Sequence, residues 1–336
     1  MKTTAARWIL ALMVLAGFLI FPANAGAGEK IRLAVEFVDH AACAHIAVDQ
    51  NWYEKSGLKV EVHDAYVTGM ALSAALSRRD VDAAYVCLFP AINARANAGA
   101  PIKIVSGTHL YGYGLVVNRD RVGHVRDLEK PGIRIGCTRE GSPGAALLNK
   151  LVEKYELDSS LVGSARRMSP PKLLLSLQTG RIDAAVMPEQ FPSMARAAGF
   201  HELVSAKDLW PGMQGSVLVV TEDFLQKRPE AVKTLVELTR KGIDYINTNP
   251  TKAAGIVTRR LNAAGKRIFP GHIAGNTEKL AVFSEVIQIS LEKKMENTWQ
   301  IDPAAVQAAI DEAARLGYIR ESFPAKEMLD LRFLNE

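Results

Sequence analysis

The sequence has few cysteines, few aromatic residues and no strongly basic segment, and each shortage excludes a class of protein. Three of its 336 residues are cysteine, which excludes a scaffold held by several disulfides. Aromatic residues make up 7%, and the formal net charge is +5, without a lysine- and arginine-rich stripe interleaved with aromatics. A nucleic-acid partner is therefore not expected. The chain also lacks the motifs of a phosphate-binding loop, a nucleophile elbow or a zinc protease.

A single long apolar run is present, and it lies at the N-terminus. Residues 8–21 follow two basic residues and precede an Ala-Asn-Ala string at 23–25, whose small side chains suit a signal peptidase. The run is shorter than the roughly 20 apolar residues that a membrane-spanning helix needs, and an uncleaved anchor is the alternative. We predict a secretory signal over residues 1–25, cleaved after Ala25 or else after Ala27, and a mature chain in the periplasm. No cysteine follows the run, so a lipid anchor is not expected.

Two short strings recur at a nearly constant spacing. Residues 31–34 (I-R-L-A) resemble residues 133–136 (I-R-I-G), and residues 81–84 (V-D-A-A) resemble residues 182–185 (I-D-A-A). The offsets are 133 − 31 = 102 and 183 − 82 = 101, so both matches share one register. This agreement in spacing and order indicates an internal duplication. Chance similarity between strand sequences is the alternative.

Each copy has the pattern strand, helix, strand, helix, strand, which predicts a mostly parallel sheet with helices on both faces. Apolar runs and their glycine, proline and aspartate boundaries set the expected elements. The first copy has strands over 31–35, 58–63 and 81–86, with helices over 44–55 and from Thr68 to Asp80. The second copy has strands over 133–137, 163–168 and 182–187, with helices over 145–155 and 170–179. Helices are expected over 223–248, 250–261, 277–294 and 302–316, packed mainly on the first lobe.

The length beyond residue 25 exceeds what one hydrophobic core usually holds, so two lobes are expected. We predict an α/β protein with a first lobe formed by residues 26–114 and 221–336 and a second formed by 119–214. Two apolar strands, 115–118 and 215–220, are expected to connect the lobes as a hinge. A hinge of this kind lets two lobes close on a ligand held between them.

The ligand cleft is expected at the carboxyl ends of the parallel strands, where open α/β sheets bind their ligands. The loops at these ends are 36–45, 65–70 and 87–93 in the first lobe, and 138–144, 169–171 and 188–192 in the second. Helix starts in these loops present free backbone N–H groups that attract anions, unless they are ordinary caps and turns. The candidate ligand-binding residues are His40, Tyr66, Thr68, Gly69, Met70, Cys87, Phe89, Tyr111, Thr138, Gly141, Ser142 and Glu189.

The charges in these loops predict an organic ligand. Backbone donors at 138–144 favour an anionic or strongly accepting group, and Glu189 favours a cation or a hydrogen-bond donor. A buried, unpaired carboxylate would repel a purely inorganic anion. We therefore expect an amino-sulfonate or a pyrimidine-like heterocycle in preference to nitrate or sulfate. The alternative is that Glu189 points away from the cleft and pairs with Arg196.

Five segments resemble one family of binding proteins. They are residues 51–58 (N-W-Y-E-K-S-G-L), 76–84 (L-S-R-R-D-V-D-A-A), 99–105 (G-A-P-I-K-I-V), 127–136 (an Asp-Leu pair, then P-G-I-R-I-G) and 180–185 (G-R-I-D-A-A). Nearly the whole mature chain resembles the type II periplasmic binding proteins of the sulfonate, taurine, nitrate and thiamine-precursor group, the NMT1/THI5-like family. The resemblance implies a two-lobed fold, a small-molecule ligand, the permease of an ABC transporter as partner, a monomer and no cofactor.

The sequence departs from the family pattern at the candidate site. Glu189 approximates the family's Glu-Pro pair, but the order is altered, because Pro188 precedes it and Gln190 follows it. Met70 stands where many relatives carry a small residue, and it would add an apolar wall. The ligand of any one relative therefore does not transfer to this chain.

Other functions on the same fold remain open, because a fold does not determine function. An enzyme could use His40 with Cys43 or Cys87, although cysteines in such positions are more often packing residues. A metal held by these three residues and His45 would lack the usual zinc-ligand spacing. A sensory protein could use the same cleft to report to a receptor. We expect no catalytic residue and no metal, and a disulfide between Cys43 and Cys87 is the less favoured alternative to free thiols.

Overall fold

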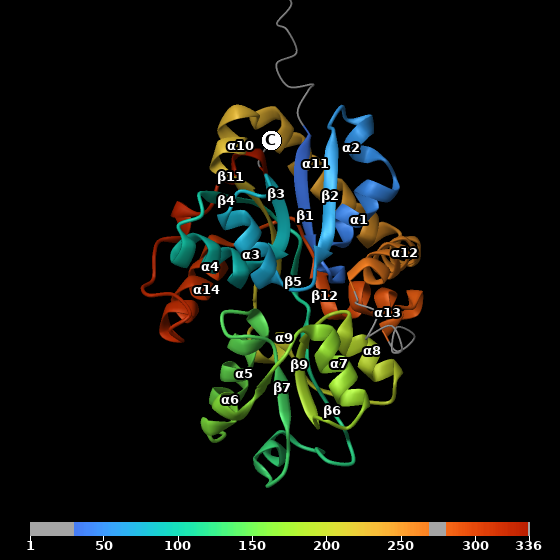
Figure 1. The fold of residues 1–336 in the computed structure, drawn as a ribbon, viewed down its shortest axis with the longest axis vertical. Coiled ribbons are helices and arrows are strands. Elements are labelled where there is room, and N and C mark those ends of the chain that lie inside the picture. The colour runs from blue at the N-terminus through green and yellow to red at the C-terminus, as the bar shows by residue number, and fades with distance from the viewer. Residues whose placement is uncertain (1–29, 269–279, 335–336) are drawn as a thin grey trace, which may run out of the picture.

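The computed structural model describes residues 30–268 and 280–334, which form two lobes stacked along the long axis of the molecule (Figure 1). The expected secretory signal and its cleavage site lie outside these residues, as does the start of the helix expected over 277–294. Each lobe contains one five-stranded sheet covered by helices. No helix within the described ranges combines the length and the apolar character that crossing a membrane requires.

The two sheets have the same strand order. The first contains, in spatial order, β2 (Val60–Tyr66), β1 (Ile31–Glu36), β3 (Ala83–Cys87), β11 (Ser216–Thr221) and β4 (Ile102–Gly107). The second contains β8 (Arg166–Arg167), β7 (Ile135–Cys137), β9 (Ala184–Pro188), β6 (Tyr113–Val117) and β10 (His201–Ser205). In each sheet the first three strands are parallel, and the fourth runs antiparallel to both neighbours.

The repeated sequence strings form the same contact in each lobe. The carboxylate of Asp82 accepts hydrogen bonds from the backbone N–H and the guanidinium of Arg32, at 2.8 and 2.6 Å. The carboxylate of Asp183 accepts the equivalent bonds from Arg134, both at 2.9 Å. Each pair fastens the start of one parallel strand to the loop before the next. We call these pairs the Arg–Asp clamps, and they give the duplication a structural basis.

Helices surround both sheets, and their positions repeat as well. In the first lobe these are α1 (Ala42–Asp49), α2 (Trp52–Lys55), α3 (Gly69–Ser77) and α4 (Leu88–Ala98). In the second they are α5 (Pro143–Lys154), α6 (Ser160–Ser164), α7 (Pro170–Gln178), α8 (Phe191–Ala197) and α9 (Ala206–Leu209). The C-terminal part adds α10 (Glu222–Lys227), α11 (Pro229–Thr248), α12 (Pro250–Ile268), α13 (Ser284–Ile289) and α14 (Pro303–Arg315). Of these, α11 packs on α1 and α14 on α4, whereas α13 also touches α8 of the second lobe.

Several element boundaries differ from the sequence-based expectation. The strand expected over 163–168 is reduced to β8, because the carboxylate of Asp158 accepts a hydrogen bond from the backbone N–H of Ser160 and a short helix begins there. The loop expected over 87–93 is helical, since α4 begins directly after β3. The helix expected to stop at Leu261 continues to Ile268.

The chain passes between the lobes just before β6 and just before β11. The backbone N–H of Gly215 donates to the carbonyl of His109 at 3.0 Å, and the N–H of Tyr111 donates to the carbonyl of Met213 at 3.0 Å. The two passages therefore pair with each other in a short antiparallel contact. The apolar strands expected as the hinge are interior strands of the sheets, which explains why they are apolar.

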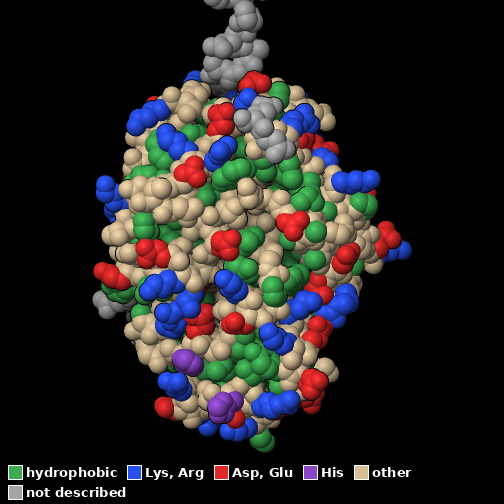
Figure 2. All heavy atoms as spheres, turned by 180° about the vertical axis from the view of Figure 1, so that it is seen from behind, with side chains coloured by type: hydrophobic (Ala, Val, Ile, Leu, Met, Phe, Trp, Pro, Cys, Tyr) green, Lys and Arg blue, Asp and Glu red, His purple; other side chains and the backbone are tan. Residues whose placement is uncertain are grey.

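The charged surface is mixed. On the face shown in Figure 2, basic and acidic side chains are interspersed over both lobes. This face therefore carries no continuous basic stripe of the kind that nucleic-acid-binding proteins present.

Candidate functional site

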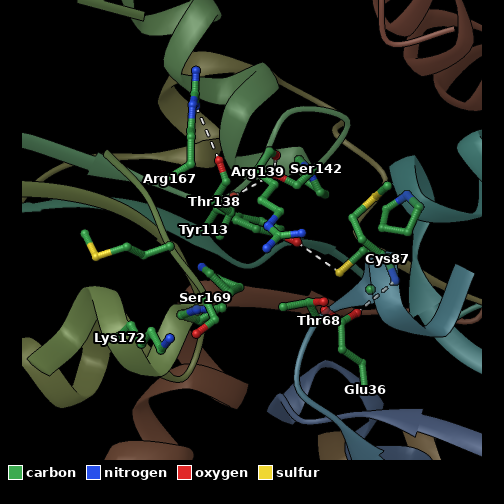
Figure 3. Close-up of a pocket in the computed structure, with 17 residues that line it drawn as sticks. Glu36, Thr68, Cys87, Tyr113, Thr138, Arg139, Ser142, Arg167, Ser169 and Lys172 are labelled. Carbon is green, nitrogen blue, oxygen red and sulfur yellow. Dashed lines mark hydrogen bonds between the residues drawn. The ribbon is translucent and has the colours of Figure 1, made fainter. Parts of the chain in front are cut away.

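A cavity of about 310 Å³ lies between the two lobes, where the parallel strands of both sheets end (Figure 3). This volume lies at the small end of the range for small-molecule sites. The cavity is lined from both lobes by residues at strand ends and helix starts: Glu36, Thr68, Gly69, Met70, Cys87, Pro90, Tyr113, Thr138, Arg139, Ser142, Pro143, Arg167, Met168, Ser169, Pro170, Lys172 and Pro188.

Related positions of the duplication meet in this cavity. Glu36 ends β1, and Thr138 stands 102 residues later, directly after β7. Thr68 and Ser169 are the residues before α3 and α7, and they are 101 residues apart. Cys87 and Pro188 end β3 and β9 at the same offset. The duplication thus places both copies of each strand end around one space, as expected for a cleft between facing lobes.

The first lobe contributes a buried carboxyl group. Glu36 is 7% exposed, and its Oε2 accepts a hydrogen bond from the backbone N–H of Cys87 at 3.4 Å. Burial raises the pKa of Glu36, although hydrogen bonds from Cys87 and from the backbone of Gly69 oppose the shift. A Cβ atom added at Gly69 would lie 2.6 Å from Pro90 Cγ and 3.1 Å from Glu36 Oε2. Because Gly69 has no side chain, the carboxyl group of Glu36 and the ring of Pro90 can lie close to its backbone.

The floor of the cavity joins the lobes through Cys87 and Tyr113. Their Sγ and Oη atoms are 2.9 Å apart, and the hydroxyl of Ser216 donates to the same sulfur at 3.5 Å. Burial raises the pKa of the Cys87 thiol well above its usual value, and the negative charge of Glu36 adds to the shift. Burial also raises the pKa of Tyr113 well above its usual value. These groups are neutral hydrogen-bonding groups at ordinary pH.

The second lobe contributes cationic side chains and helix starts. Ser142 caps α5 by accepting from the backbone N–H of Ala145 at 3.3 Å, and its Oγ lies 2.6 Å from Oγ1 of Thr138. The guanidinium of Arg167 is held by the carbonyls of Thr138 and Val162, at 3.3 and 2.8 Å. Such a wall suits an anion, because helix starts present a positive dipole end.

Two further cations line the second-lobe side. Arg139 reaches toward the middle of the cavity, and Lys172 projects from the first turn of α7 (Figure 3). Both side chains are exposed, so they remain hydrated until a ligand covers them. Together with Arg167, which also forms an ion pair with Glu140 at 3.8 Å, they place three positive charges on one wall, opposite the carboxyl group of Glu36.

Half of the residues predicted from the sequence line this cavity. These are Thr68, Gly69, Met70, Cys87, Thr138 and Ser142. The others lie outside its lining: His40, Tyr66, Phe89, Tyr111, Gly141 and Glu189. Sequence reasoning missed Glu36 and the three cations, although Glu36, Arg139 and Arg167 stand at or beside a strand end and Lys172 lies in the first turn of the helix that follows β8. A charged residue at the carboxyl end of a parallel strand was the available signal.

The residues outside the lining have structural contacts of their own. Phe89 is 1% exposed within α4 and makes an edge-to-face contact with Trp210, and Tyr66 is half-buried in β2. Tyr111 lies in the passage between lobes, where its hydroxyl accepts from the backbone N–H of Gly212 at 3.3 Å. Gly141 has a φ of +78°, and its carbonyl accepts from the amide of Asn93 at 3.0 Å.

Glu189 is enclosed beside the cavity. It is 0% exposed, and its Oε2 accepts from the backbone N–H of Ser193 at 3.3 Å. Arg196, its expected alternative partner, instead forms an ion pair with Glu202 at 3.2 Å. The carboxyl group that faces the cavity is that of Glu36, at the end of β1.

The three cysteines and His40 are buried and uncharged. Cys43, Cys87 and Cys137 are all free, and burial raises the pKa of Cys43 to about 12 and of Cys137 to about 11. His40 Nε2 donates to the carbonyl of Gly112 at 3.0 Å, and burial lowers the pKa of His40 well below its usual value. Within the described ranges, no three His, Cys, Asp or Glu side chains are arranged to hold a metal ion. A cysteine nucleophile needs a lowered pKa, and these thiols have the opposite shift.

Comparison with known proteins gives one family and one fold. Residues 25–261 match the NMT1-like family. The structure is similar to the ligand-binding component of an ABC-type import system from Staphylococcus aureus with zinc bound. The TM-score is 0.76, with 17% identity over 92% of this chain and 99% of that one.

Two further solved structures share the fold. The alkanesulfonate-binding protein SsuA from Xanthomonas axonopodis pv. citri, bound to MOPS, has a TM-score of 0.73 and 15% identity, covering 90% of this chain and 99% of that one. The periplasmic nitrate-binding protein NrtA from Synechocystis has a TM-score of 0.74 and 14% identity, covering 91% and 87%. At these identities the likeness shows the fold alone, and it confirms the predicted fold class.

Curated relatives are longer than this chain. The bicarbonate transport ATP-binding protein CmpC from Synechococcus elongatus is 23% identical over 239 residues, which is 65% of this chain and 35% of that protein. The nitrate import ATP-binding protein NrtC from Synechocystis is 22% identical over 235 residues, with the same shares. The chain thus spans about a third of the length of these relatives.

Proposed function

This chain belongs to the NMT1-like family, and from that premise we propose that it is a periplasmic solute-binding protein of an ABC importer. It captures a small organic molecule with an anionic group between its lobes and delivers it to the permease in the cytoplasmic membrane. The fold supports this role, because the similar structures include ligand-binding components of import systems. The two ATP-binding relatives belong by name to bicarbonate and nitrate transport, which supports an ABC transporter as partner.

The charge arrangement of the cavity carries the proposal. Arg139, Arg167 and Lys172 line the second-lobe wall, and the buried carboxyl group of Glu36 lines the first-lobe wall. An inorganic anion would satisfy the cations, but it would leave Glu36 with only the donors that the protein itself supplies, such as the backbone N–H of Cys87. A ligand with an anionic group at one end and a donor at the other would satisfy both walls, because buried polar groups need partners. Of the two ligand classes expected from the sequence, the three cations favour an amino-sulfonate over an uncharged pyrimidine.

The ligand class can be tested by calorimetry with compounds that differ by one group. Taurine carries both a sulfonate and an amine, ethanesulfonate lacks the amine, and ethanolamine lacks the sulfonate. We expect taurine to bind most tightly, ethanesulfonate more weakly, and ethanolamine, nitrate and sulfate not measurably. Nitrate or ethanolamine binding as tightly as taurine would contradict the proposed ligand class.

The transport role needs a separate measurement. In cells that lack this chain, uptake of the compound that binds in calorimetry should fall to background, and restoring the chain should restore uptake. Unchanged uptake with retained binding would favour a sensory role over delivery.

A further inference from the structure

Beside the cavity, the lobes meet through buried polar side chains that the proposed function does not use. We call Asp39, Glu189, Gln190, Glu202, Ser290 and Lys294 the junction patch. Asp39 lies in η1 (Asp39–Ala41), after β1, and Ser290 and Lys294 begin and end the π-helical turn η5 (Ser290–Lys294), which follows α13. The other three belong to the second lobe, two directly after β9 and one in β10. The patch therefore contains side chains from both sides of the hinge.

The junction patch is closed off from solvent and poorly satisfied. Asp39, Glu189, Gln190 and Ser290 are 0% exposed. Within the described residues, the amide atoms of Gln190 and Glu189 Oε1 have no hydrogen-bond partner, and the carboxylate of Asp39 has only weak ones, in the hydroxyl of Ser290 and its own backbone N–H. Unpaired buried polar groups each cost about 1–3 kcal/mol. Separation of the lobes would let water hydrate these groups, so their burial lowers the stability of the joined state.

The charges in the patch do not balance. Glu202 pairs with Lys294 across the lobes at 2.5 Å and with Arg196 within its own lobe at 3.2 Å. Among the residues that the structure describes, Asp39 and Glu189 have no ion-pair partner of their own, and they lie near enough for the charge of Asp39 to act on Glu189. Burial raises the pKa of Asp39 to about 7. Burial, followed by the negative charges of Asp39 and Glu202, raises the pKa of Glu189 to about 8, against the attraction of Lys294.

We propose that the junction patch is a proton-dependent clasp: protons on Asp39 and Glu189 hold the lobes together, and loss of these protons favours their separation. The clasp goes beyond the proposed function, because it acts on the hinge whether or not a ligand is bound. The neighbouring His40 does not contribute a charge, because its ring faces the carbonyl of Gly112 and its pKa is lowered. Besides Asp39, the charged groups that act on Glu189 are Glu202 and Lys294, and Arg196 pairs with Glu202.

The direction of the pH effect follows from the two states of each carboxyl group. In separated lobes, hydrated Asp39 and Glu189 would titrate near their usual pKa values of about 3.9 and 4.3. Joined lobes hold the protons up to about pH 7 and 8. The stabilisation of the joined state is therefore complete below about pH 4 and is lost as the pH rises through 7 to 8. Each unit of pKa difference is a tenfold change in the equilibrium between joined and separated lobes.

The clasp can be tested without a ligand, by small-angle X-ray scattering of the purified full exported protein between pH 5 and 9. We expect the ratio of separated to joined lobes to rise at least tenfold between pH 6 and 8.5. The Asp39→Asn/Glu189→Gln double variant should remain joined across this range. A matched control, Asp120→Asn/Glu230→Gln, changes one exposed carboxylate on each lobe and should respond as the unmodified protein does. A pH-independent scattering curve of the unmodified protein, or a pH response retained by the double variant, would overturn the proposal.

Hydrogen exchange of the unmodified protein gives a second readout if the double variant does not fold. After correction for intrinsic exchange rates, the protection factors of amides in α8 and η5 should fall at least tenfold between pH 6 and 8.5. The protection factors of amides in α5 should stay the same. Equal loss in all three elements would indicate general unfolding and contradict the clasp. Constant protection in α8 and η5 would contradict it as well. Neither outcome bears on the ligand class, so failure of the clasp and failure of the proposed function are distinguishable.

Discussion

The two lobes are copies in their scaffold and differ where they face each other. Both sheets have one strand order, and both contain an Arg–Asp clamp at the same place. At the cavity, however, Glu36 of the first lobe corresponds to Thr138 of the second, and Cys87 corresponds to Pro188. The two copies agree at the residues that hold each lobe together and differ at these residues that line the cavity. Departures from the repeat are therefore the better guide to function.

The largest expected effect distinguishes the roles of the two cavity walls in ligand binding. Glu36→Gln removes the carboxylate that we assign to the amine of the ligand, and losing one partner of a buried charge pair costs about 2–5 kcal/mol. Taurine affinity should therefore fall at least 30-fold, whereas ethanesulfonate, which lacks the amine, should bind as before. Calorimetry of both compounds checks this. An equal loss for both would show that Glu36 supports the wall but does not contact the ligand.

The next effect compares the two clamps. The side chain of Asp183 is 4% exposed and that of Asp82 is 22% exposed, so Asp183 is the more deeply buried partner. We expect Asp183→Asn to lower the free energy of unfolding by about 2–3 kcal/mol and Asp82→Asn by about 1 kcal/mol. Urea unfolding measures both. Equal costs would mean that burial does not distinguish the clamps.

The Asp183 clamp should also contribute to acid sensitivity. Hydrogen bonds from Arg134 hold the pKa of Asp183 below its usual value. A lowered pKa means that the stabilisation is complete above about pH 4 and is lost as the pH falls through the lowered value. Unfolding curves of Asp183→Asn should therefore change less than those of the unmodified protein between pH 5 and 3.

A smaller effect concerns the cationic wall. Arg139 is exposed within the cavity, so Arg139→Gln should weaken taurine and ethanesulfonate alike, by about tenfold, or about 1.4 kcal/mol. Arg126→Gln removes an exposed arginine of the same lobe away from the cavity and should change neither affinity. A loss confined to taurine would assign Arg139 to the amine end and contradict the proposed orientation.

The smallest expected effect concerns an internal position of the repeat. Ala34 in β1 corresponds to Gly136 in β7, and a Cβ atom at Gly136 would lie 2.6 Å from Ile182 Cδ1 and from Leu173 Cδ2. Gly136→Ala should lower the free energy of unfolding by about 1 kcal/mol, because both neighbours are side-chain ends that can move. If Gly136→Ala instead raised the free energy of unfolding, the second lobe would accommodate an alanine at this position as the first lobe accommodates Ala34.

The sequence predicted the scaffold well because the scaffold depends on local patterns. The Asp82 and Asp183 strings, the apolar strands and the helix caps such as Ser142 are all visible within short stretches of chain. Glu36 lies in the predicted loop 36–45 but was not identified, because the contacts of its carboxyl group come from Gly69 and Cys87, which are distant in the sequence. Glu189 looked equivalent at a strand end, but it is fully buried and lies near Asp39 and Lys294, which are distant in the sequence and which no local pattern reveals.

The passages between the lobes also determine the order in which the molecule can be completed. All five strands of the second sheet lie within residues 113–205, so this lobe is an uninterrupted insertion in the first. The first sheet needs β11, at residues 216–221, to join β3 to β4. When the chain emerges N-terminus first into the compartment where it folds, every strand of the second lobe therefore emerges before the strand that closes the first. The first lobe, whose strands β1 to β3 emerge first, is therefore the last to have all of its sheet strands available.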